Sequence, residues 1–146
     1  MKRWFLTASS RRHDPRARGA AIVEFAVVLP LLITILFGII EYGWVFMVRQ
    51  TLQHAAREAC RTAVLSTSTD ADIDARITDI MATTNVASYT STKTHATGPC
   101  QPIETVTVSV PYSDISLTGG FFGTTDYNLV GSASMRKEGL GPCPGS

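Results

Sequence analysis

The longest apolar segment of the chain, residues 20–40, is interrupted only by Glu24 and Thr34. As an α-helix this segment would extend about 31 Å at 1.5 Å per residue, enough to cross the hydrocarbon core of a bilayer. No Ala-x-Ala cleavage site interrupts the run, so a conventional secretory signal is not indicated. The segment therefore predicts a transmembrane helix, with the membrane half of that helix covering residues 20–48.

The charge of the chain divides at the start of this segment. Residues 1–19 hold six basic residues against Asp14 alone, a net charge of +5, whereas the rest of the chain carries −4. Basic residues beside a membrane helix stay on the cytoplasmic side. We therefore expect a cytoplasmic leader over residues 1–19, a single crossing of the cytoplasmic (inner) membrane and an extracytoplasmic domain over residues 49–146. A nucleic-acid-binding arm is the weaker interpretation of the basic segment, and no nucleic-acid partner is expected.

Glu24 places a carboxylate inside the apolar segment, five residues after Gly19. Such a charge costs free energy unless a partner neutralises it, so intramembrane acids are candidates for function. The alternative is a glutamate that merely extends its carboxylate to the membrane interface. At the other end of the segment, Tyr42 and Trp44 suit the far interface, where aromatic rings gather.

Helical periodicity continues beyond the membrane segment. One helix is expected from about Ala20 to Leu65, of which residues 49–65 extend into the domain. A second, amphipathic helix is expected over residues 70–83, because its apolar residues repeat at helical spacing. The two apolar stripes are Leu52, Ala56, Cys60 and Val64 on the first helix, and Ile73, Ile77, Ile80 and Met81 on the second.

After Asn85 the composition shifts to Thr, Ser, Val and Tyr, which favour strands. A small antiparallel sheet of about three to four strands is expected within residues 87–136, followed by a tail over residues 137–146. The fold class is therefore α+β. The expected strands are Ala87–His95, Ile103–Tyr112 and Tyr127–Arg136. Two aromatic residues in the loop between the last two strands, Phe121 and Phe122, are expected to fold back over the core.

The chain has three cysteines. In an oxidising compartment Cys100 and Cys143 are the natural disulfide pair, since both lie in Gly/Pro-rich loops whereas Cys60 lies in a helix. Pairing of Cys60 with either of the others remains open.

Residues for catalysis or for cofactor binding are not apparent. The sequence has no nucleophile elbow, phosphate loop or dinucleotide fingerprint, so no enzyme and no cofactor are expected. A metal site is not expected either, because His13, His54 and His95 lie far apart and no Cys-x-x-Cys pair occurs.

Several of these features together resemble the processing segment of type IV pilin-like proteins: a basic leader that ends in Gly19, a cut before Ala20, Glu24 at the fifth position after the cut, then Phe25. The Glu-Phe pair and the segments that follow it resemble more closely the TadE-like (TadE/TadF) minor pseudopilins of the tight-adherence, Flp-type pili. These segments are Val28-Leu29-Pro30-Leu31-Leu32, Gly38-Ile39-Ile40-Glu41-Tyr42-Gly43 and Ala55-Ala56-Arg57-Glu58-Ala59-Cys60-Arg61.

The resemblance implies a pilin-like fold and a non-enzymatic role in pilus assembly. It implies that a prepilin peptidase cuts between Gly19 and Ala20, and that Glu24 and Phe25 serve processing and assembly. The implied partners are the bilayer, the peptidase, other pilins and pseudopilins, and the pilus secretion machinery. The alternative is an uncleaved, single-pass anchored extracytoplasmic binding domain.

Overall fold

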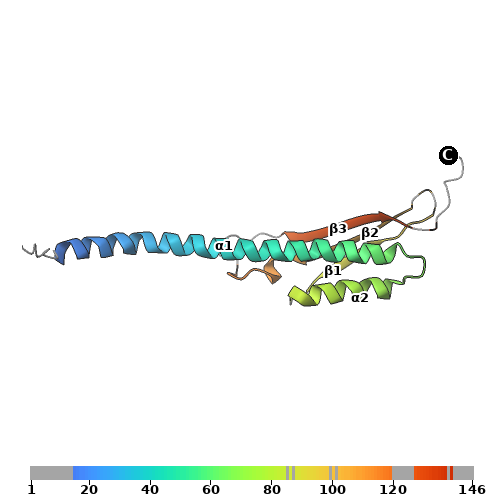
Figure 1. Ribbon diagram of the computed structural model, residues 1–146, viewed down its shortest axis with the longest axis horizontal. Helices are drawn as coiled ribbons and strands as arrows, with labels where there is room; N and C mark the ends of the chain where they lie inside the picture. Colours follow the sequence, from blue (N-terminus) through green and yellow to red (C-terminus); the bar gives the residue numbers. More distant parts are fainter. Residues whose placement is uncertain are drawn as a thin grey trace, which may run out of the picture. The chain divides into compact units, whose positions relative to one another are not determined.

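The computed structural model describes residues 15–84, 86, 88–98, 100, 102–119, 127–137 and 139. These residues form two α-helices, two 3-10 turns and a three-stranded sheet (Figure 1). They divide into two compact units, with the boundary between Phe37 and Gly38. The elements in chain order are α1 (Pro15–Ala63), α2 (Asp70–Met81), η1 (Ala82–Thr84), β1 (Thr90–Thr94), β2 (Ile103–Pro111), η2 (Tyr112–Asp114) and β3 (Asn128–Arg136). The expected α+β fold is confirmed.

The first unit contains the N-terminal part of α1, which begins at Pro15 rather than at Ala20. Proline suits the first helical position, because its ring presets a helical φ and its missing N–H would have no partner there. A second proline, Pro30, lies inside the helix, where its carbonyl accepts a 2.8 Å hydrogen bond from the Thr34 hydroxyl. Thr34 is the one neutral polar side chain of the apolar segment, and this hydrogen bond gives its hydroxyl a partner on the same helix.

In the second unit, α1 presents a stripe of small residues to the core. Its buried apolar residues are Val48, Leu52, Ala55, Ala56, Ala59, Cys60 and Ala63, which recur on one helical face. Because alanine side chains are small, neighbouring backbones can approach the helix closely. The expected packing of this stripe against the domain is confirmed.

The second helix, α2, returns alongside α1 after a short connection (Figure 1). A capping box starts it: the Thr69 side chain accepts from the Asp72 N–H, and the Asp72 carboxylate accepts from the Thr69 N–H at 2.8 Å. This arrangement satisfies backbone donors that the first helical turn leaves free. The helix ends at Met81 and the chain continues in η1 to Thr84, close to the expected end at residue 83.

The sheet has the antiparallel order β1-β2-β3. Along β2, alternate residues face the core, namely Glu104, Val106, Val108 and Val110. The opposite face carries hydroxyl pairs across β2 and β3, Thr105 with Ser134 at 2.8 Å and Thr107 with Ser132 at 3.0 Å. One face of the sheet is therefore apolar and the other polar, as in an antiparallel sheet covered on one side.

The sheet approaches α1 tightly at Gly131 of β3. A Cβ atom at this position would overlap the backbone carbonyl group of Leu52, so no larger residue fits without a shift. Beside it, the Gln53 side chain donates a 2.8 Å hydrogen bond to the carbonyl of Ser132. The position of β3 on the helix is thus set by one glycine and one amide.

Candidate functional site

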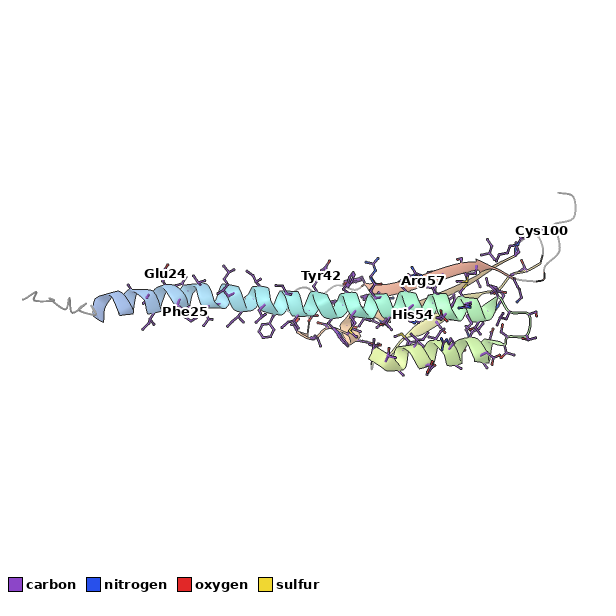
Figure 2. All side chains as sticks on the ribbon, in the orientation of Figure 1. Glu24, Phe25, Tyr42, His54, Arg57 and Cys100 are labelled. Atoms are coloured by element: carbon purple, nitrogen blue, oxygen red, sulfur yellow. The ribbon has the colours of Figure 1, made fainter. Side chains whose placement is uncertain are left out.

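The structure places the four residues expected to serve processing and assembly on the first part of α1. Gly19 and Ala20 are both helical and exposed, so the bond expected to be cut lies within a helical turn. Glu24 and Phe25 follow one turn later and point to opposite sides of the helix in Figure 2. Both side chains are exposed, and Glu24 makes no hydrogen bond or ion pair with any residue that the structure describes.

The surface around Glu24 is apolar on every side of the helix. Large apolar side chains from Ile22 to Ile40 are exposed around the whole circumference, with no stripe reserved for a core. A helix that is apolar all round is suited to lipid or to contact with other apolar helices. Within the described residues, α1 is the one helix long and apolar enough to cross a membrane, which fits single-pass membrane anchoring.

A second carboxylate of α1, Glu41, has the opposite surroundings. It is 4% exposed and accepts four hydrogen bonds from the segment that follows β2. The donors are the hydroxyls of Tyr112 (3.0 Å) and Ser116 (2.8 Å) and the backbone N–H groups of Leu117 and Thr118 (both 3.1 Å). Sequence reasoning missed this role. The sequence did contain a signal for it: Glu41 directly follows the apolar segment, and no basic residue lies three or four positions from it on the helix.

Trp44 strengthens the same attachment. Its indole N–H donates a 2.9 Å hydrogen bond to the carbonyl of Ile115, and its ring is half-buried against the core. Tyr42 is exposed, as a ring at a membrane interface would be, whereas Trp44 binds the domain. Glu41 and Trp44 therefore hold the segment 112–118 against α1.

A third carboxylate, Glu104, lies in the core-facing row of β2 and is 1% exposed. It accepts from the Lys137 ammonium at 2.9 Å and contacts the His95 ring at 3.1 Å, and that ring also contacts Asp70 at 3.2 Å. Burial alone would raise the pKa of Glu104, but the Lys137 hydrogen bond and the Ala96 N–H hold the pKa below its ordinary value. This cluster ties the beginning of α2 to the ends of all three strands.

The cysteines are only partly described. Cys60 is a buried free thiol whose sulfur donates to the Glu104 carbonyl at 3.4 Å. Cys143 lies outside the described residues, as do Phe121 and Phe122, and the Cys100–Cys143 bridge stays a prediction.

Residues 19–61 match the family model described as TadE-like protein. No curated protein and no solved structure gives a significant match. The matched segment begins at Gly19, includes Glu24, Phe25 and Glu41, and ends near the last turn of α1. Over these residues the chain is therefore similar to TadE-like proteins, which is consistent with a TadE-like protein of the tight-adherence pilus system.

Proposed function

We propose that this chain is a minor pseudopilin, a non-enzymatic component needed to assemble a tight-adherence (Flp-type) type IV pilus, and that it is processed after Gly19. The observation that carries the proposal is Glu24: an exposed carboxylate without a described partner, on a helix that is otherwise apolar all round. The family match over residues 19–61 supports an association with pilus machinery.

Glu24 supports this role because a charge in lipid costs free energy. An uncompensated carboxylate within a membrane helix is costly, so a partner that neutralises it gains affinity and a defined register. Cleavage before Ala20 creates an α-amine whose reference pKa is about 7.7 to 8.0, which keeps much of it cationic near neutral pH. We propose that such an amine, on this or a neighbouring subunit, binds Glu24 when apolar helices stack.

Gly19 supports the processing step. Because Gly19 lies within α1, a peptidase must first unwind the turn around the Gly19–Ala20 bond. Glycine disfavours the helix by about 1 kcal/mol relative to alanine, so it lowers the cost of this unwinding. Removal of residues 1–19 also removes the basic segment, which leaves an apolar helix with one acid near its new end.

The first experiment is co-expression of the full chain with a prepilin peptidase, followed by N-terminal sequencing. The expected product begins at Ala20. Gly19→Ala is expected to reduce cleavage about five-fold, since alanine stabilises the helix that must open by about 1 kcal/mol. Gly43→Ala is the matched control: a Cβ meets nothing within 4 Å at either glycine, so neither variant disturbs packing. An uncut chain beginning at Met1 supports the alternative, an anchored extracytoplasmic binding domain.

The second experiment tests the assembly role of Glu24. Glu24→Gln is expected to leave membrane insertion intact and to abolish or strongly reduce pilus formation, scored by electron microscopy. A double variant, Glu24→Gln with Val28→Glu, returns the acid one helical turn away and keeps the charge. Restored piliation in the double variant would show that any acid suffices, and normal piliation in Glu24→Gln would show that none is needed.

A further inference from the structure

A cavity of about 370 Å³ opens between α1 and the beginning of β3. Its lining includes the aromatic rings of Tyr42, Phe46 and Tyr127 and the side chains of Arg49 and Val130. Ligand sites in proteins have volumes of about 300 to 1,000 Å³, so this cavity is large enough for a small polar group and its apolar attachment.

Arg49 gives the cavity its charge. It is exposed, and it makes no ion pair or hydrogen bond with any described residue. It is also the first basic residue after Arg18, so it is the first cation that the chain provides beyond the apolar segment. No acidic residue occurs from Tyr42 to Arg57 or from Tyr127 to Lys137, the two stretches that contribute the lining. Among the described residues that line the cavity, Arg49 is therefore the one that carries a charge.

The walls of the cavity are held in place by neighbouring contacts. The Tyr127 ring stacks on Tyr112 with centroids 5.0 Å apart, and the Tyr112 hydroxyl is one of the donors to Glu41. The other wall is α1 itself, from Tyr42 to Arg49. Two of its rings are strongly exposed, Tyr42 at 78% and Phe46 at 56%. The aromatic side chains thus surround the charge without covering it.

The position along α1 identifies the surroundings of the cavity. The apolar segment ends just before Glu41, and Arg49 follows about 12 Å further along the helix axis. The Cα–Cβ bonds of a helix tilt toward its N-terminus, and Arg49 lines the cavity together with Tyr42 and Phe46, which precede it on α1. Headgroup layers extend about 5 to 8 Å beyond each side of the hydrocarbon core, within the reach of this long side chain.

We propose that this cavity binds the phosphate headgroup of a membrane phospholipid, with Arg49 paired to the phosphate and Tyr42, Phe46 and Tyr127 packed around the glycerol and upper acyl carbons. A guanidinium matches the phosphate in a bidentate geometry, and aromatic rings are favoured where one end of a site is apolar and the other wet. The site orients the domain on the membrane surface. It does not depend on cleavage after Gly19 or on a role in pili.

The test uses the full chain in detergent, analysed by native mass spectrometry with added phosphatidylglycerol. One bound phospholipid per chain is expected, with retention reduced about ten-fold in Arg49→Gln, the effect of one lost charge-assisted contact. Phe46→Ala should also reduce retention. Arg57→Gln is the matched control, because Arg57 is likewise exposed and without a described ion pair, two turns further from the apolar segment. Diacylglycerol, which lacks the phosphate, should bind at least about ten-fold less.

Several outcomes would overturn the proposal. These are equal retention by wild type and Arg49→Gln, an equal loss in Arg57→Gln, or retention of diacylglycerol as strong as that of phosphatidylglycerol. Displacement of the lipid by millimolar inorganic phosphate would assign the site to a free anion instead. A dimer of this chain that disappears in Arg49→Gln, with lipid retention unchanged, would assign the cavity to a second copy.

Discussion

The two carboxylates of α1, Glu24 and Glu41, differ in where their partners come from. Glu24 is exposed on an apolar surface and has no described partner, whereas Glu41 is buried and receives four hydrogen bonds from residues 112–118. Each would be costly to bury without compensation. The chain itself compensates Glu41, which makes it a structural residue, whereas no described residue compensates Glu24.

The comparison shows that an acid in or beside an apolar helix does not by itself mark function. Glu41 shares its helix with Glu24, yet its contacts explain it fully as the attachment of the segment 112–118. An exposed acid without a partner is different, since nothing within the described part of the chain accounts for its cost. Substitutions of the two carboxylates, and of other structural residues of the domain, test this difference.

Replacing Glu41 should destabilise the domain, while replacing Glu24 should not. Glu41→Ala removes the acceptor for donors of Tyr112, Leu117 and Thr118 and the buried carboxylate itself, and we expect a loss of about 3 kcal/mol in the free energy of unfolding. Denaturant unfolding in detergent, followed by tryptophan fluorescence, measures this loss. Glu24→Ala is the control, with no expected change. Equal stability of the two variants would contradict a structural role for Glu41 that Glu24 does not share.

Replacing Gly131 should likewise destabilise the domain, while replacing Gly19 should not. Gly131→Ala forces a Cβ into the backbone of Leu52 and should cost about 2 kcal/mol by overpacking. Gly19→Ala meets nothing within 4 Å and should leave the unfolding of the domain unchanged. The same unfolding assay compares them. A neutral Gly131→Ala would mean that β3 can shift away from α1 without penalty.

The capping box of α2 should contribute less. Thr69→Ala removes the acceptor for the Asp72 N–H and one partner of the Asp72 carboxylate. We expect a loss of about 1 kcal/mol, the usual cost of an N-cap replacement. Thr69→Ser keeps the hydroxyl and serves as the control. A loss as large in the serine variant would indicate that the methyl group, and not the cap, is responsible.

The smallest expected change is in the pH dependence of stability, which Glu104 should influence. The folded-state pKa of Glu104 lies below its ordinary value of 4.5. Above pH 4.5 its contribution to stability is complete, and it is lost as pH falls through the folded-state pKa, because the unfolded chain takes up the proton first. Wild type should therefore lose stability below pH 4.5 more steeply than Glu104→Gln. If the stabilities of wild type and Glu104→Gln fall in parallel with pH, Glu104 does not contribute to the pH dependence.

Local patterns predicted most of the elements. The all-round apolar segment indicated the membrane helix, and helical spacing of isoleucines indicated α2 within two or three residues at its end. Alternating valines located β2, and its predicted start at Ile103 agrees with the structure. The start of α1 was placed too late, because Pro15 was not recognised as a first helical residue. These errors concern boundaries, where local signals are weakest.

The residues that hold the domain together could not be predicted in the same way. Glu41 and its donors are separated by more than 70 positions in the chain, and Glu104 meets Lys137, which directly follows β3. Glu104 even occupied a core-facing position in the β2 alternation, a signal that could have been recognised. Trp44 was expected at the membrane interface because its ring is aromatic, and the hydrogen bond of its indole N–H to the Ile115 carbonyl had no signal in the sequence.

The sequence alone determined which segment is suited to a membrane, where the charge of the chain divides, and that Glu24 lies five residues after Gly19. These properties depend on composition and on spacing along one helix, which the backbone geometry fixes locally. The folded structure was needed to recognise Glu41 as a structural acid, to explain the glycine at position 131, and to find Arg49 beside a cavity without an ion pair to any described residue. Those properties depend on groups brought together from distant positions, and burial and hydrogen bonding between them exist only after the chain has folded.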